Sequence, residues 1–168
     1  MAVQDYFIKL DGIDGESKDS KHKNEIDIIS FHFKATQAGT SATGGGAGKG
    51  KLQAHDLQII KKVDKASPKI YQYCCSGQPI KSLILTARKA GKDQQEHYKV
   101  TLSDVLVSSF THGTTNVADP GAAADWEPTE EIHFNYSTIE LGYKEQQPDG
   151  TLSGEVKGTW DFKQNKPK

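Results

Sequence analysis

The chain has 168 residues, a formal net charge of −1 and a hydrophobic content of 35%. This length suits a single domain spanning residues 1–168, and the sixteen glycines favour many short strands joined by turns over a helical bundle. Because nucleic acids and anionic membranes attract strongly basic surfaces, the balanced charge argues against both as partners.

The sequence also lacks the patterns of a membrane protein. No window approaches the roughly 20 consecutive apolar residues of a membrane-spanning helix. The first residues, MAVQD, lack the basic region and the long apolar run of a cleaved signal peptide. We therefore expect no membrane insertion and synthesis in the cytoplasm, so that any export follows a route that needs no such signal.

A first strand is predicted over residues 6–10, followed by a turn at residues 11–15. The aspartates of this turn suggest a calcium loop, but Ile13 occupies a position that would have to provide an oxygen ligand. We therefore interpret this segment as a plain turn.

Residues 24–35 alternate between apolar and polar side chains, which predicts a strand with one buried and one exposed face. The residues expected in the core are Ile29, Phe31 and Phe33, and those on the opposite face are Ser30, His32 and Lys34. His32 has the chemistry of a metal ligand or a base, but its polar neighbours and the lack of a second His nearby favour a solvated surface residue.

A long loop of small residues covers 36–50 and ends in GGGAGKG. A phosphate-binding loop does not fit, because Thr43 stands where the first Gly is required and Gly50 replaces the Ser or Thr after the Lys. Thr43 also breaks the match to a nucleophile elbow. A loop this long in a compact domain is typical of a functional or contact loop.

A strand is predicted over residues 51–63, and a short helix follows at about 67–77. Ser67 is predicted as its N-cap, Pro68 as its first residue and Gly77 as its left-handed stop. The apolar stripe of this helix consists of Ile70, Tyr73 and Cys74. Two turns are marginally stable alone, so the helix must dock on the strands.

Cys74 and Cys75 are adjacent, a spacing that does not suit a disulfide. We expect two reduced thiols, with Cys74 buried and Cys75 at the edge of the stripe. A reactive dithiol is the alternative, but neither His nor Arg is adjacent to activate a thiolate.

Further strands are predicted over 82–88, 96–101, 102–110, 130–136, 138–143 and 156–162, before a polar C-terminal tail at 163–168. The apolar run at 102–110 is expected to be covered on both faces. About nine strands and one helix predict a mainly β fold, either a barrel or a sandwich of two sheets.

The sequence shows no catalytic constellation. None of the six histidines pairs with another at metal-binding helical spacing, and there is no Cys-x-x-Cys motif. We therefore predict no metal, cofactor or catalytic residue, which favours a protein that works by assembly or binding. A monomeric ligand-binding or catalytic β-barrel stays open as the alternative.

Several motifs in a fixed order resemble the haemolysin-coregulated protein (Hcp) family, the tube subunits of type VI secretion systems. The similar segments are 7–10 (FIKL), 15–19 (GESKD), 25–27 (EID), 44–49 (GGGAGK), 67–68 (SP), 74–77 (CCSG), 88–91 (RKAG), 95–98 (QEHY), 102–109 (LSDVLVSS), 128–130 (PTE), 135–136 (NY) and 158–160 (GTW). One departure lies at residues 31–34, FHFK, where the family commonly has Trp and Ser and where Lys34 replaces Gly.

The resemblance implies a β-barrel of two antiparallel sheets with one short flanking helix at about 67–77. Six copies would close into a homohexameric ring, and stacked rings would form a tube that a contractile sheath propels. The implied partners are other copies of the chain, effector proteins in the lumen, the tip spike protein and the sheath. Hcp proteins are secreted through this system and are not enzymes.

The resemblance also assigns roles to two sets of residues. The residues expected to face the lumen and contact effectors are Ser30, His32 and Lys34. Those expected to support ring stacking are Thr40, Gly44, Gly45, Gly46, Gly48 and Lys49.

Overall fold

A computed structural model describes residues 4–38, 52–89, 94–113 and 128–168. The strands within these ranges are β1 (Gln4–Leu10), β2 (Ile26–Ile28), β3 (Ser30–His32), β4 (Ala35–Gln37), β5 (Leu52–Ala54), β6 (Leu57–Lys62), β7 (Ile80–Lys89), β8 (Glu96–Gly113), β9 (Thr129–Asn135), β10 (Thr138–Tyr143) and β11 (Val156–Asp161). The described helix is α1 (Ser67–Ser76). The mainly β fold with one flanking helix confirms the predicted fold class.

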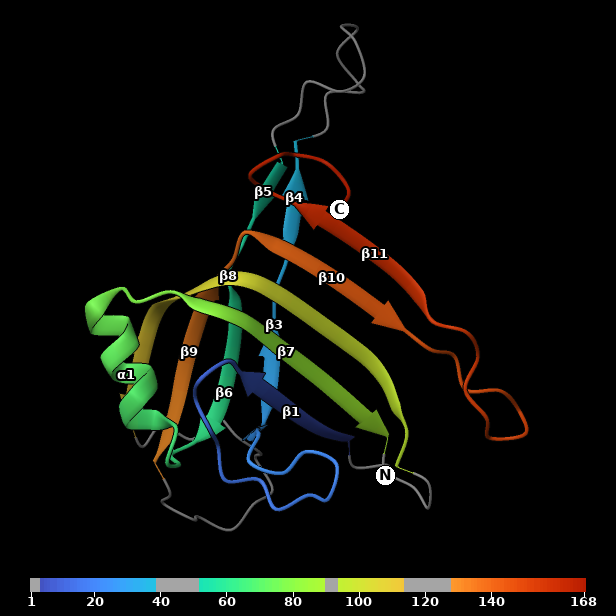
Figure 1. The fold of residues 1–168 in the computed structure, drawn as a ribbon, viewed down its shortest axis with the longest axis horizontal. Coiled ribbons are helices and arrows are strands. Elements are labelled where there is room, and N and C mark those ends of the chain that lie inside the picture. The colour runs from blue at the N-terminus through green and yellow to red at the C-terminus, as the bar shows by residue number, and fades with distance from the viewer. Residues whose placement is uncertain (1–3, 39–51, 90–93, 114–127) are drawn as a thin grey trace, which may run out of the picture.

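The strands form two antiparallel sheets that share β8. The first sheet has the order β2-β1-β7-β8-β10-β11 and uses residues 96–105 of β8. The second sheet has the order β8-β9-β6-β3 and uses residues 106–113 of β8. Figure 1 shows the first sheet in front of the second, with α1 at one end, the β10–β11 pair at the other, and the β4–β5 ribbon projecting from the top.

The hydrophobic core fills the space between the two sheets. Its largest fully buried apolar residues are Ile8, Ile26, Leu57, Ile59, Ile70, Ile80, Leu83, Leu85, Leu102, Ile132 and Phe134. Among the described residues no ladder joins β2 to β3, so the barrel is not closed. The two sheets therefore meet as an open barrel whose second sheet ends at β3.

β8 is one 18-residue strand, not the two strands predicted for residues 96–101 and 102–110. Asp104 has a positive φ of 50°, and the pairing register with β9 shifts between Val107 and Ser109. These irregularities bend the strand out of one sheet and into the other. Burial alternates along its second half, with Val105 and Val107 buried and Leu106 exposed, so the expectation of two covered faces is wrong.

The predicted strand at 24–35 is also divided. A bend at Ile29 separates β2, which pairs with β1, from β3, which pairs with β6. Ile28 is buried before the bend, and Phe31 packs against the core after it. The side chains that point into the core are therefore at even positions before Ile29 and at odd positions after it. Ile29 is 37% exposed, which corrects its predicted core position.

Residues 51–63 likewise form two strands rather than one. β5 pairs with β4, and β6 pairs with β3 and β9. Thr36 and Gln37 belong to β4, so the predicted loop at 36–50 begins inside a strand. Its residues from 39 onward lie outside the described ranges.

The end of β6 places a lysine at a core position. The side chain of Lys61 is fully buried, and its Nζ lies 3.0 Å from Oε2 of Glu130 and 2.8 Å from Oδ1 of Asp64. Ser67 donates to Glu130 over 2.8 Å and is 3.1 Å from Lys61 Nζ. This buried network ties β6, β9 and α1 together.

The network also explains why α1 begins differently from the prediction. Ser67 is the first helical residue and Ala66 is the N-cap, with Pro68 inside the first turn. The Asp64 carboxylate accepts from the Ala66 N–H, and the Ser67 hydroxyl accepts from the Asp64 N–H, over 2.9 and 3.0 Å. Ser67 is therefore wrong as the N-cap, because its hydroxyl serves the buried network instead.

The rest of the helix follows the prediction more closely. Gly77 has a φ of 66° and ends α1 in the left-handed conformation. Ile70 is buried, while Tyr73 and Cys74 are half-buried against the core, so Cys74 is less buried than expected. Cys74 and Cys75 are free thiols, as predicted.

Candidate functional site: the outer face of the second sheet

The outer face of the second sheet carries a row of polar side chains. The strand register pairs His32 with Gln58, and Gln58 with His133. Directly paired residues project from the same side of a sheet. Because the neighbours of Gln58, Leu57 and Ile59, are buried in the core, Gln58 and its partners point outward.

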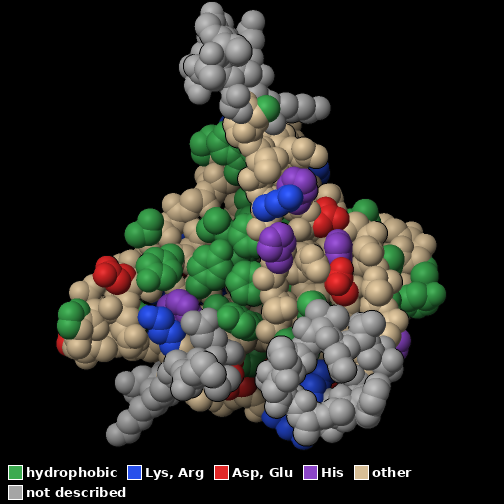
Figure 2. Space-filling view, turned by 180° about the vertical axis from the view of Figure 1, so that it is seen from behind, with side chains coloured by type: hydrophobic (Ala, Val, Ile, Leu, Met, Phe, Trp, Pro, Cys, Tyr) green, Lys and Arg blue, Asp and Glu red, His purple; other side chains and the backbone are tan. Residues whose placement is uncertain are grey.

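We call this surface the polar face. Its polar residues are Ser30, His32, Lys34, Asp56, Gln58, Glu131, His133 and Asn135, and the half-buried Ile60 lies among them. Figure 2 views the molecule from this side, where histidine, lysine and acidic side chains lie beside a hydrophobic patch. Charges of both signs occur close together, so the face has no strongly basic or acidic region.

Hydrogen bonds hold several of these side chains in place. His133 Nε2 lies 2.9 Å from Oε1 of Glu131. Asn135 donates to Asp56 over 2.9 Å, and the Ser108 hydroxyl donates to the other carboxylate oxygen of Asp56. The face therefore offers fixed donors and acceptors to a partner across an open sheet surface.

The predicted lumen residues lie in or just beyond β3. Ser30 is half-buried and pairs with Ile60, whereas His32 and Lys34 are exposed. The Lys34 carbonyl accepts from the His55 N–H over 3.0 Å. The stacking residues Thr40, Gly44, Gly45, Gly46, Gly48 and Lys49 fall outside the described residues.

Reasoning from the sequence missed the partners of His32 on this face. Gln58 and His133 are distant in sequence, and only the strand order brings them into one row with His32. A signal for their exposure was present, because each alternates with buried apolar residues on its own strand. Nothing in the sequence gave the order of the strands.

The second sheet also has two open edges. Within the described residues, no strand pairs with the free side of β3 or with the side of β8 residues 106–113 that faces away from β9. Unpaired N–H and C=O groups along such edges are templates for pairing with another chain. A protein that keeps two of them on one sheet has the means to join copies of itself side by side.

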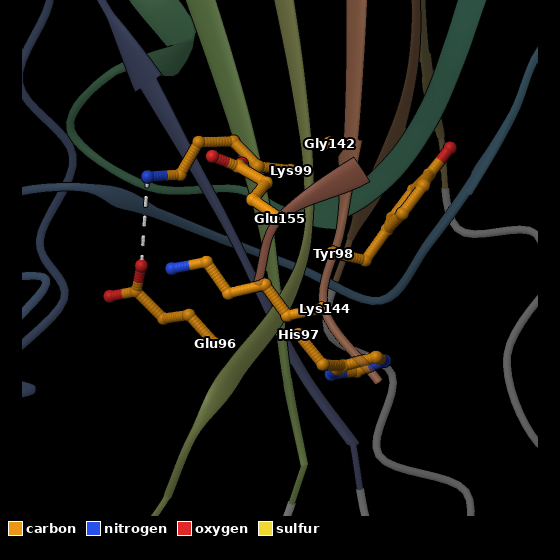
Figure 3. A pocket seen from close by; sticks show the side chains of 7 residues that line it. All are labelled: Glu96, His97, Tyr98, Lys99, Gly142, Lys144 and Glu155. Atoms are coloured by element: carbon orange, nitrogen blue, oxygen red, sulfur yellow. Dashed lines mark ion pairs between the residues drawn. The ribbon is translucent and has the colours of Figure 1, made fainter. Parts of the chain in front are cut away.

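A polar pocket in the first sheet, beside β8 and β10, is too small to be a candidate binding site. It is lined by residues of β8 and β10 with Glu155, and Lys99 pairs there with Glu96 at 3.7 Å (Figure 3). Its volume is about 20 Å³, which admits a single water molecule. Burial lowers the pKa of His97 in this pocket, and its Nδ1 has no partner among the described residues.

Other kinds of site also lack support in the described part of the chain. No group of three or more His, Cys, Asp or Glu side chains there is arranged to hold a metal ion. No helix among those residues is long and apolar enough to span a membrane. Together, the open sheet edges and the polar sheet face favour contacts with other protein chains.

Comparison with known proteins identifies the family to which the chain belongs. The family model for the type VI secretion system effector Hcp matches residues 7–143. The protein Hcp1 of Pseudomonas aeruginosa is 38% identical over 167 residues, covering 98% of each chain. The chain belongs to the Hcp family.

Solved structures agree with this assignment. A type six secretion system protein has a TM-score of 0.88 and 29% identity, covering 99% of this chain and 100% of its own. Hcp1 from Salmonella typhimurium has a TM-score of 0.77 and 31% identity, with both chains fully covered. The predicted family and fold are thus confirmed over nearly the whole chain.

Membership in the family settles the broad function. Hcp proteins are structural, secreted tube proteins of the type VI secretion system and not enzymes. The family implies ring oligomers and partners within this secretion system. This confirms the predicted function over the alternative of a monomeric ligand-binding or catalytic barrel.

Proposed function

We propose that six copies of this chain close into a ring whose channel is lined by the polar face of each second sheet. The observation that carries this proposal is the combination of one polar face, one buried face and two open edges on the same four-stranded sheet. In a cyclic ring each copy contributes two different surfaces, one to each neighbour. The β3 edge of one copy meets the β8 edge of the next, so that the second sheets form a continuous inner wall.

Stacking of such rings into a tube is the second part of the proposal. The loop between β4 and β5 contains Thr40, Gly44, Gly45, Gly46, Gly48 and Lys49, the residues to which we assign contacts between rings. Support comes from the β4–β5 ribbon, which projects from the two main sheets (Figure 1). The tip spike protein and the contractile sheath are the proposed partners of the finished tube.

The third part concerns cargo in the channel. Ser30 and His32 lie on the outer side of β3 and Lys34 follows the strand, and His32 has Gln58 and His133 beside it in one row. A ring repeats each residue six times, so individually weak contacts combine into retention of an effector protein. Release of the chain with the tube requires no cleaved signal peptide.

The substitution His32→Asp tests the cargo role. Because His32 is exposed and makes no core contact, the ring should still assemble, while the added negative charge disturbs the binding of effectors. The measurement is recovery of effector proteins that co-purify with tagged rings. Lys9→Asp is the matched control, since Lys9 is exposed on β1 in the other sheet.

We expect effector recovery to fall with His32→Asp and to stay at the wild-type level with Lys9→Asp. Equal recovery with both variants would remove the role of His32 in cargo binding. Collapse of the ring with His32→Asp alone would show that this face contacts another subunit instead of the channel.

A further inference from the structure

An apolar groove lies between the β10–β11 pair and residues 33–37, the segment that follows β3 and includes β4. It has a volume of about 490 Å³, and we call it the Trp160 groove. Its lining residues are Phe33, Ala35, Gln37, Leu52, Tyr136, Ile139, Leu141, Trp160, Phe162 and Asn165. None of them is charged.

The groove contains an unsatisfied donor. The indole Nε1 of Trp160 is buried and has no hydrogen-bond partner among the described residues. A buried N–H without an acceptor destabilises the structure, because the donor has lost its hydrogen bond to water without gaining another. The occupant of the groove is therefore expected to bring a hydrogen-bond acceptor together with apolar surface.

A surface that offers both a hydrogen-bond acceptor and apolar area lies on α1, at the opposite end of the molecule (Figure 1). Tyr71 on α1 is 56% exposed, and Cys75, one turn further along, is exposed beside it. A hydrogen bond with the Cys75 side chain raises the pKa of Tyr71 above its ordinary value. α1 has no acidic residue in its first turn and no basic residue in its last turn.

The two surfaces lie next to the two open edges of the second sheet. The groove adjoins the end of β3, because Phe33 directly follows β3 and Ala35 begins β4 two residues later. α1 adjoins the β8 edge, where the Tyr71 and Phe110 rings meet edge to face at a centroid distance of 5.4 Å. Figure 1 shows α1 and the β10–β11 pair at opposite ends of the molecule.

We infer that the Tyr71–Cys75 face of α1 docks in the Trp160 groove of the neighbouring copy in the ring. This inference rests on the proposed ring, because joining the β3 edge of one copy to the β8 edge of the next brings α1 of that neighbour toward the groove. The Tyr71 ring supplies apolar surface and its hydroxyl oxygen supplies an acceptor for the Trp160 N–H. Each groove thus binds and covers α1 of one adjacent copy.

Cross-linking of thiols tests this contact, because Cys75 already provides one partner. Ala35→Cys and Leu141→Cys each place a second thiol in the groove, and Ala35 is small and exposed, so its replacement perturbs the fold little. Thr36→Cys and Glu140→Cys are the matched controls, since these adjacent residues do not line the groove. Assembled full-length protein is treated with a short bifunctional maleimide and separated by denaturing electrophoresis.

The expected result is a ladder from covalent dimers up to the full ring in the groove variants, with only background in the controls. Adding Cys75→Ser should abolish the ladder, and peptide mapping should join the introduced thiol to the α1 peptide. Rings that assemble normally but give no more cross-linking than the controls would overturn the inference while leaving the proposed ring intact. A wild-type chain that forms no ring would overturn both.

A second measurement does not depend on new thiols. Tyr71→Asp places a charge on the docking face of α1, and Gln72→Asp places the same charge on an adjacent exposed residue. We expect Tyr71→Asp to raise the concentration at which rings dissociate by at least about tenfold, because a charge then faces an apolar groove. Equal dissociation of the two variants would contradict the docking of Tyr71.

Discussion

Lys61 shows how a charged residue can occupy a core position in this fold. Its Nζ lies near the carboxylates of Glu130 and Asp64, the hydroxyl of Ser67 and the carbonyl of Lys62, at distances from 2.7 to 3.1 Å. Each buried charge thus has a partner of opposite sign. The network fixes where α1 begins relative to β6 and β9. It thereby favours this arrangement of the helix over alternative packings.

Replacement of Lys61 by Met should therefore be costly. The substitution leaves Glu130 buried without its cation, and breaking a buried ion pair in this way typically costs about 3–5 kcal/mol. Urea unfolding at a fixed protein concentration measures the loss. Lys65→Met, at an exposed position, should change the free energy of unfolding by less than about 0.5 kcal/mol. Similar losses in both variants would contradict this account of the network.

Asp19 makes stability depend on pH at the acidic end. A hydrogen bond from Arg88 lowers the pKa of Asp19 from 3.8 to about 2, and the two groups lie 2.7 Å apart. Because the pKa in the folded state is below that in the unfolded state, ionised Asp19 stabilises the fold above about pH 4. This contribution is lost as the pH falls through the folded-state pKa of about 2.

Asp19→Asn should lower stability at pH 7 by about 1–2 kcal/mol, since partial exposure weakens the ion pair. The difference from wild type should shrink as the pH falls from 5 toward 2. Unfolding free energies of both proteins across this range measure the effect. A difference that is constant with pH would show that the ionised Asp19–Arg88 pair does not contribute.

At the residue scale, the sequence predicts local roles but not partners. The alternation in 24–35 correctly places Phe31 and Phe33 against the core and leaves His32 exposed. The buried position of Lys61 was not predictable, because its partner Glu130 is 69 residues away. The hydroxyl of Ser67 suited an N-cap locally, but the distant carboxylate of Glu130 binds it.

At the element scale, α1 depends on how it is terminated. Gly77 has a φ of 66°, a conformation that side chains with a Cβ adopt only with strain. A Cβ added there would meet nothing within 4 Å, so the cost of substitution comes from the backbone alone. Gly77→Ala should therefore destabilise the chain by about 1 kcal/mol in thermal or urea unfolding. Gln72→Ala, on the exposed surface of α1, should be neutral or slightly stabilising, and a neutral Gly77→Ala would contradict the role of this cap.

The positions of strands were predictable, but their divisions were not. Hydrophobic periodicity indicates that a segment is a strand, yet it does not report where the strand passes from one sheet to another. The bend at Ile29 and the positive φ of Asp104 arise because β2–β3 and β8 each serve both sheets. The bends change which alternate residues point into the core. For this reason Ile29 was wrongly predicted to be buried, and residues 102–110 were wrongly predicted to be covered on both faces.

At the scale of the whole molecule, two strand edges have no strand partner among the described residues and one apolar groove is open. They are the β3 edge, the β8 edge and the Trp160 groove, and all three border the second sheet or the strand that leaves it. The proposed ring satisfies all of them with one repeated contact. In that ring the same contact would turn the six polar faces toward a common channel, which joins the proposed assembly of the chain to its proposed role in carrying effectors.

The molar mass of the full-length chain in solution tests the ring most directly. The chain has a mass of 18.4 kDa, so a hexamer has a mass of about 110 kDa. Size-exclusion chromatography with light scattering at about 50 µM, a concentration that favours assembly by mass action, should give this value. Negative-stain images of the same peak should show closed rings with six-fold symmetry. A species of 18.4 kDa under these conditions would contradict the account.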